Sequence, residues 1–173
     1  MTFEFIIFIL ISLLFILFFI FINRNTKKQT LKKTDNHRVK LTDEQKLQKG
    51  LEYEDFVASF YKNKGYKVIH RGRELGKLDK GIDLVAYNSK EILLIQCKNY
   101  NIHTGWKITQ KDIKAFRMDC LDLIESNPKY RQFQIKAIFI VSDKFIDKGA
   151  IVYIKQKQKE GKKLYYKLIP FLS

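Results

Sequence analysis

The stretch that decides the fold is DKGIDLVAYNSKEILLIQCK, at residues 79–98. Residues 82–87 and 91–98 have the apolar, β-branched composition of two strands, and the Asn-Ser-Lys between them is a short turn. The second strand contains four consecutive apolar residues, 92–95. Such a run is typical of a central strand that is covered on both faces. We therefore expect this pair of strands to lie in the middle of a sheet.

Polar side chains interrupt these apolar strands. Gln96 and Lys98 occupy alternate positions, so period-2 geometry puts both on one face of the strand and Cys97 on the other. Asp83 opens the first strand just after Gly81, where the chain turns tightly. Buried polar groups need partners, so these side chains are expected to serve one another around a metal ion. Taken singly, Asp83 also fits a turn residue, and the other two fit an exposed strand end.

A helix precedes the two strands. Thr42 with Gln45 three residues later has the pattern of a capping box, and Gly65 is a typical helix end. Glu54 lies inside the apolar stripe of this helix, where an unpaired carboxylate is costly. A salt bridge at the helix end is the alternative interpretation of Glu54. The stripe consists of Leu47, Leu51, Ala58 and Tyr61.

The remaining elements follow from the same patterns. Thr109 with Asp112 predicts the start of a second helix, which ends before Pro128. The order of elements is therefore αβββαβ followed by αβ, which indicates an α/β fold with a mixed central sheet flanked by helices. The other predicted elements are strands at 66–70, 135–141 and 164–169, a loop at 71–81 and a helix at 144–159.

An apolar segment at the N-terminus predicts a membrane anchor. From 5 to 22 the single residue that is not strongly apolar is Ser12, and a run of this length spans a hydrocarbon core of about 30 Å. We predict a transmembrane helix at 3–22. A cleavable signal peptide is the main alternative, but the segment has neither a positive n-region nor a small-residue cleavage site.

Charge around this segment predicts its orientation. Residues 23–49 contain nine Lys or Arg and three acidic residues, whereas Glu4 is the charged side chain that precedes the segment. The positive-inside rule then places the C-terminal part in the cytoplasm, as a single-pass membrane protein. We interpret 23–44 as a basic linker and 45–173 as the folded domain.

Composition limits the classes of function. The net charge of +15 favours nucleic acid or anionic lipid as partner, although a biased genomic composition would also enrich lysine. The two cysteines have no metal-ligand spacing, and the three histidines stand far apart, which argues against a zinc site or a nucleophilic triad. No glycine-rich phosphate loop occurs.

Four motifs occur in a telling order: GLEYE at 50–54, GYKV at 65–68, DKGIDL at 79–84 and IQCK at 95–98. Together they resemble the Mrr-type restriction endonuclease family of the PD-(D/E)XK nuclease superfamily. The resemblance implies a restriction-endonuclease-like core that hydrolyses DNA phosphodiester bonds with a divalent metal. The expected role is defence against foreign DNA or DNA processing.

The resemblance also implies roles for five residues. Asp83, Gln96, Glu54 and the backbone carbonyl of Cys97 would hold Mg²⁺ or Mn²⁺, with Gln96 in place of the commoner acid. Oxygen donors of this kind suit a hard cation. Lys98 would position the attacking water and stabilise the charge on the phosphate. The catalytic set is thus Glu54, Asp83, Gln96 and Lys98.

Contacts with DNA are predicted in two loops that flank these motifs. Trp106 belongs to the second loop, and a solvated loop is the alternative interpretation for both. No small-molecule substrate is expected, and many nucleases of this type act as homodimers. The predicted contact residues are Arg71, Arg73, Lys77, Lys80, Asn99 and Lys107.

Two other classes of function remain open from the sequence. One is a catalytically silent DNA-binding module that tethers nucleic acid to the membrane. The other is a membrane-surface protein whose basic charge meets lipid headgroups alone. The positive charge extends well beyond the juxtamembrane linker, which argues against the second.

Overall fold

The described part of the chain comprises residues 42–75, 81–99 and 105–171 of a computed structural model. Thr42–Ser173 form a compact unit of their own. The predicted membrane segment 3–22 and most of the predicted linker lie outside the described residues. Among the helices that are described, none has the length and apolar character needed to cross a bilayer.

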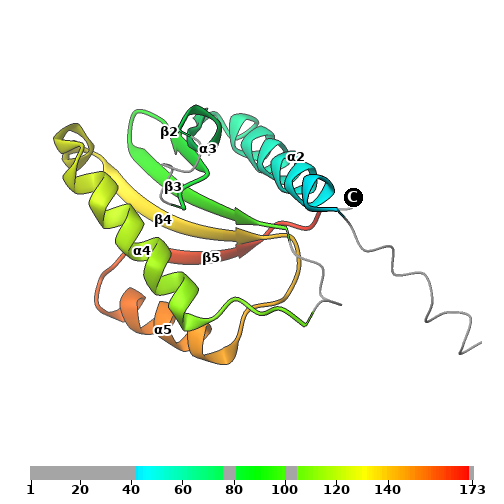
Figure 1. Cartoon of the computed structure of the whole chain (residues 1–173). Coiled ribbons are helices and arrows are strands. Elements are labelled where there is room, and N and C mark those ends of the chain that lie inside the picture. Colours follow the sequence, from blue (N-terminus) through cyan, green and yellow to red (C-terminus); the bar gives the residue numbers. More distant parts are fainter. Residues whose placement is uncertain (1–41, 76–80, 100–104, 172–173) are drawn as a thin grey trace, which may run out of the picture. The chain divides into compact units, whose positions relative to one another are not determined.

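Within these residues five strands form one mixed sheet in the order β1-β2-β3-β4-β5 (Figure 1). The strands β1 to β3 pair antiparallel, whereas β3, β4 and β5 pair parallel. The sequence prediction of a mixed sheet with the second strand of the pair at its centre is confirmed. The strands are β1 Lys67–His70, β2 Leu84–Tyr87, β3 Glu91–Lys98, β4 Gln134–Val141 and β5 Leu164–Leu168.

Helices cover both faces of this sheet. The helix α2 packs on one face, over β1, β2 and β3, and α4 and α5 lie side by side on the other. Parallel neighbours need such crossover connections, and here α4 links β3 to β4 and α5 links β4 to β5. The helices are α2 Asp43–Lys62, α3 Arg71–Leu75, α4 Gln110–Glu125, the short 3-10 helix η3 Pro128–Gln132 and α5 Lys148–Lys159.

Two hydrophobic cores result, one on each face, and β3 supplies both. Leu93 and Ile95 pack against Tyr53 and Val57 of α2, whereas the alternate residues of β3 face α4 and α5. Burial of a side chain of this size stabilises the fold by roughly 1.5–3 kcal/mol. The four-residue apolar run is therefore buried on both faces, as its sequence indicates.

The helix starts follow the predicted capping patterns. Thr42 and Gln45 form a reciprocal capping box, with hydrogen bonds of 2.9 and 3.2 Å. At the start of α4, the backbone N–H and the hydroxyl of Thr109 both donate to Asp112 Oδ2, at 2.7 and 2.8 Å. These bonds satisfy N-terminal groups that have no partner within the helix.

Several predicted boundaries were wrong. Residues 71–75 form α3 where a loop was expected, and their position depends on contacts with the distant residues Asp83 and Asp55. The helix α5 begins at Lys148 and not at 144, because Ile146 pairs with Ile108 as an isolated bridge and Asp147 caps the helix. The helix η3 was not predicted.

The predicted apolar stripe of α2 was also partly wrong. Leu47 is 65% exposed, whereas the buried side chains are Tyr53, Val57, Ala58 and Tyr61. The first ten residues of the helix contribute no buried side chain. The spacing of Leu47 and Leu51 therefore does not predict which face of α2 contacts the sheet. Glu54 itself is half-buried, beside this face.

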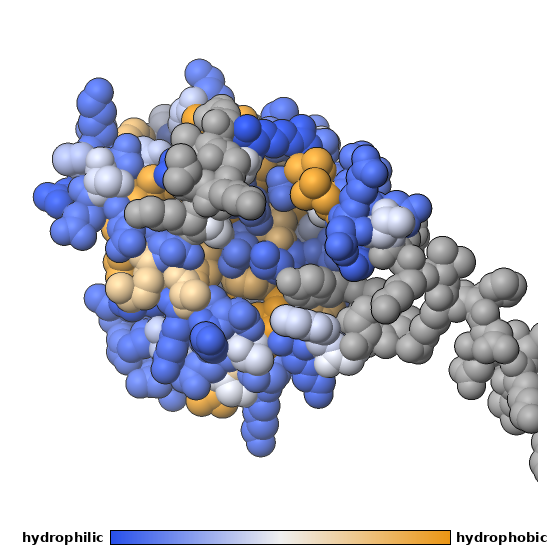
Figure 2. All heavy atoms as spheres, viewed as in Figure 1, coloured by the Kyte–Doolittle hydropathy of each residue, from blue (hydrophilic) through white to orange (hydrophobic). Residues whose placement is uncertain are grey.

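Hydrophilic residues dominate the face of the molecule drawn in Figure 2, with smaller hydrophobic areas between them. The exposed apolar residues are dispersed over several elements, and Trp106 is the largest of them. Single exposed apolar residues are normal on a soluble surface, so Trp106 is notable for its position, described below.

Candidate nuclease site

The candidate site lies at the start of β2, where the pairing of this strand with β3 stops. The backbone N–H of Asp83 donates to the Ile95 carbonyl at 2.9 Å. The next N–H of β3 along this edge, that of Cys97, donates to the side chain of Asp83, with Oδ2 at 2.6 Å. Because β2 begins at Leu84 and not at 82, the carboxylate replaces a backbone acceptor and is held at the end of the sheet pairing.

The end of β3 presents the predicted alternation. Gln96 and Lys98 line a pocket between β3 and α4, together with Phe139 of β4. Cys97 is buried on the opposite face, in the core beneath α2. The prediction that Cys97 faces away from its two neighbours is therefore confirmed.

Glu54 approaches the same strand end from α2. The pKa of the Cys97 thiol is raised well above its usual value, first by burial and then by the nearby carboxylates of Asp83 and Glu54. Lys98 acts on the same thiol in the opposite direction. Glu54, Asp83 and Lys98 thus lie close enough to the Cys97 thiol to act on it electrostatically. Gln96 and Lys98 line the pocket on the other face of β3. The catalytic roles of these four residues stay predictions.

The oxygen atoms gathered here fit a hard divalent cation. Within a strand, the N–H and C=O of one residue point to the same side, so the Cys97 carbonyl faces the side of Asp83. The Lys98 carbonyl points the other way and accepts from Ser142 at 3.2 Å. Two carboxylates, an amide and a carbonyl are donors that Mg²⁺ and Mn²⁺ accept.

This donor set is not a cluster of acidic or sulfur ligands. Among the described residues, no three side chains of His, Cys, Asp or Glu lie close enough together to hold a metal. Two of the four predicted ligands are an amide and a backbone carbonyl. A cluster of three His, Cys, Asp or Glu side chains is therefore not expected at this site. The roles of Glu54, Asp83, Gln96 and Cys97 as ligands stay predictions.

The pocket beside Lys98 is small and charged. It encloses about 190 Å³, whereas pockets for small organic ligands measure about 300–1,000 Å³. Lys107 and Trp106 line it from the loop after β3, and Trp106 is 63% exposed. The pocket lining combines two lysines and two aspartates with the exposed Trp106.

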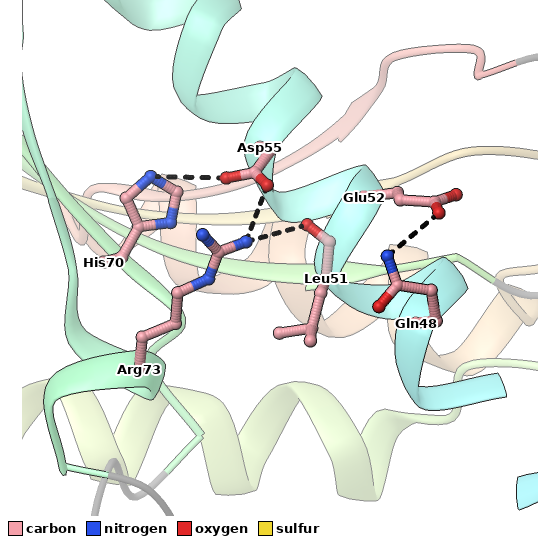
Figure 3. A network of polar contacts seen from close by, with 6 residues as sticks. All are labelled: Gln48, Leu51, Glu52, Asp55, His70 and Arg73. Carbon is pink, nitrogen blue, oxygen red and sulfur yellow. Dashed lines mark hydrogen bonds and ion pairs between the residues drawn. The ribbon is translucent and has the colours of Figure 1, made fainter. Parts of the chain in front are cut away.

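The other predicted DNA contacts have different surroundings. Arg73 donates to Asp55 at 2.7 Å and to the Leu51 carbonyl at 3.3 Å, so it fastens α3 to α2 (Figure 3). His70 approaches the second oxygen of Asp55 at 3.7 Å. One guanidinium nitrogen of Arg73 donates both hydrogen bonds, and both acceptors belong to α2.

The four remaining predicted contacts complete this comparison. Asn99 donates to the Lys49 carbonyl at 3.2 Å and ties the end of β3 to α2. The Nε of Arg71 is buried. Lys77 and Lys80 lie outside the described residues, so of the six predicted contacts the structure places Lys107 at the pocket.

Sequence analysis missed Asp119 of α4. A methyl group added to Gly81 would lie 2.9 Å from Asp119 Oδ2 and 3.3 Å from Gln96 Nε2. Asp119 also lines the pocket, together with Asp112 and Phe116. The available signal was a carboxylate next to the apolar stripe of α4, since Asp119 precedes the buried Cys120 and follows Phe116 by three residues.

A family model for the catalytic domain of Mrr-type restriction endonucleases matches residues 47–160. This match covers more than half of the chain. The chain belongs to this family. It matches no curated protein and no solved structure at a significant level.

Membership of the Mrr-type family accounts for the fold and the general activity. The matched residues run from α2 through α5 and include every predicted catalytic position. The mixed sheet flanked by helices is a restriction-endonuclease-like α/β fold, and the domain is a DNA endonuclease.

Gly81 offers a first prediction for this site. Its φ is +73°; Gly161 has a similar φ of +76°, but a methyl group added there would meet no atom within 4 Å. We expect Gly81→Ala and Gly161→Ala each to lower the free energy of unfolding by about 1–2 kcal/mol, because both force a left-handed residue. Gly81→Ala should in addition slow DNA cutting on the order of a hundredfold, since the methyl group would displace Asp119 and crowd Gln96 beside it.

The measurements are chemical denaturation and single-turnover cutting of plasmid DNA for both variants. Gly161→Ala is the control for backbone strain without a local collision. Equal cutting rates for the two variants would show that the space above Gly81 is irrelevant to activity.

Proposed function

We propose that this Mrr-type endonuclease requires a divalent metal, held by Asp83, Glu54, Gln96 and the Cys97 carbonyl, and that it acts at a membrane. The observation that carries the proposal is the hydrogen bond from the Cys97 backbone to Asp83 Oδ2. It fixes a carboxylate at the Cys97 backbone, next along β3 to the Gln96 that the family pattern pairs with it.

The residues of the chain have distinct tasks in this proposal. The pocket walls, Lys107 and Trp106 bind and orient the DNA strand. Lys98 holds an ammonium group where a phosphate would enter, so it offsets charge that develops on the phosphoryl oxygens and orients the attacking water. Cleavage leaves a 5′-phosphate and a 3′-hydroxyl.

The bound metal, Mg²⁺ or Mn²⁺, would polarise the phosphodiester and lower the pKa of a water molecule. Two carboxylates, those of Asp83 and Glu54, lie close to the buried end of β3. Both carboxylates lie close enough to the Cys97 thiol to raise its pKa, which supports the assignment of Asp83 and Glu54 as ligands of one cation.

The proposal is tested with the full chain in mild detergent. Plasmid and single-stranded DNA are incubated with Mg²⁺, with Mn²⁺ and with chelator. Cutting that needs metal supports the proposal. DNA binding without cutting on either substrate, with both metals, would overturn it and favour the silent tether instead.

Trp106 provides a second prediction, because it is the single tryptophan of the chain and lies at the pocket. Stacking of a base on an aromatic side chain contributes about 1–3 kcal/mol. We expect Trp106→Ala to weaken binding of single-stranded DNA by roughly 5- to 150-fold. In the wild-type protein, DNA added in chelator should quench the tryptophan fluorescence.

Met118→Ala is the matched control, since Met118 is 52% exposed on α4 and does not line the pocket. It should bind DNA as the wild-type chain does. Unchanged fluorescence at saturating DNA would place the DNA elsewhere on the domain.

The membrane part of the proposal rests on the sequence of residues 3–22. We propose one transmembrane helix with the endonuclease domain in the cytoplasm, where it meets DNA of foreign or cellular origin. Alkaline extraction of membranes tests the anchor, because a spanning helix stays with the lipid and a surface-bound protein is released. Protease access from each side of the membrane tests the orientation.

A further inference from the structure

Asp119 of α4 lies beside Gln96 in an arrangement that no sequence motif predicts. Asp119 Oδ2 and Gln96 Nε2 both lie within 3.3 Å of one point, the position of a methyl group on Gly81. Both side chains line the same pocket. The absence of a side chain at Gly81 therefore leaves a space that both groups border.

The chemistry of an amide makes this neighbour important. Gln96 has an oxygen that can bind a cation and an NH₂ group that cannot, and a half-turn about the last bond exchanges them. A carboxylate accepts hydrogen bonds and does not donate them. Asp119 therefore favours the orientation in which the NH₂ group faces α4 and the oxygen faces away from it.

We infer that Asp119 is a positioning residue that orients the Gln96 amide so that its oxygen faces the metal. The inference rests on the proposed function, since it gives Gln96 a cation to bind. It also explains why α4, which carries none of the family motifs, contributes a half-buried carboxylate to the pocket. Outer partners of this kind change metal affinity or activity by about 10- to 100-fold.

A glutamate at position 96 separates orientation from charge. Its two oxygens are equivalent, so it needs no orienting partner, but it would stand beside Asp119 as a second carboxylate. Asp119→Ala alone should leave the amide free to turn, and Gln96→Glu alone should place like charges together. The double variant has neither an amide that needs orienting nor two neighbouring carboxylates.

The experiment measures Mn²⁺ binding by electron paramagnetic resonance and DNA cutting under single-turnover conditions, with the full chain in detergent. We expect Asp119→Ala in the wild-type background to lose about 10- to 100-fold in Mn²⁺ affinity and in rate. Gln96→Glu with Asp119→Ala should recover to within roughly threefold of wild type, because the two effects are coupled. Asp119→Asn, which keeps the shape, should resemble Asp119→Ala.

Asp122→Ala is the matched control, because Asp122 is exposed on the same helix and does not line the pocket. Thermal unfolding shows whether each variant is folded. Additive losses in the double variant, or unchanged Mn²⁺ affinity in Asp119→Ala, would overturn the inference. Metal-independent behaviour of the wild-type chain would instead overturn the proposed function, so the two failures are distinguishable.

Discussion

Asp83→Asn is expected to reduce DNA cutting by about a thousandfold while the domain stays folded. Asparagine keeps an oxygen that can accept the Cys97 N–H, now 2.6 Å from Asp83 Oδ2, so the end of the β2–β3 pairing is preserved. The charge that would hold the metal is lost, and interactions of this kind contribute several kcal/mol to the transition state. The measurement is the single-turnover cutting rate at saturating Mg²⁺.

Thermal unfolding of Asp83→Asn checks the structure, since loss of this hydrogen bond would lower the free energy of unfolding by about 1 kcal/mol. Asp122→Asn on the exposed face of α4 is the matched control and should cut normally. A rate for Asp83→Asn within tenfold of wild type would remove Asp83 from the catalytic set.

Lys98→Met should lower the cutting rate by about a hundred- to a thousandfold, with a much smaller effect on DNA affinity. Methionine keeps most of the aliphatic stem and removes the ammonium group, which lines the pocket beside Gln96. A fixed positive charge acts mainly on charge that develops in the transition state. The rate at saturating enzyme and the dissociation constant in chelator are measured separately.

Lys107→Met is the comparison within the same pocket. If Lys107 contacts the backbone of DNA, its removal weakens binding and reduces the salt dependence by about one counterion, while the rate at saturation is kept. The assignment of Lys98 to chemistry would be wrong if both variants changed affinity alone.

Asp83 and the alternation of β3 show what local sequence determines. A run of four apolar residues predicts burial on both faces, and period 2 then fixes which side chains share a face. The buried residues Leu93, Leu94 and Ile95 and the opposite placement of Cys97 and Gln96 follow from this rule. The capping boxes at Thr42 and Thr109 are equally local, because their hydrogen bonds join residues three apart.

Other features depend on partners far along the chain, and there the sequence predictions failed or were silent. Residues 71–75 are helical although a loop was expected, and Arg73 reaches Asp55 across 18 positions. Leu47 has the spacing of a buried residue but is exposed, as the first ten residues of α2 contribute no buried side chain.

The sequence by itself determined the five strands, the three longer helices, their order and the faces of β3. The roles of the four predicted catalytic residues stay predictions. Periodicity and capping act over a few residues, so they can be predicted without the fold. The tertiary structure alone decided that Asp119 and Gln96 both lie beside Gly81 and that Trp106 and Lys107 border the same pocket. These contacts arise when α4 packs on the sheet, and no local pattern specifies which side chains of two packed elements will meet.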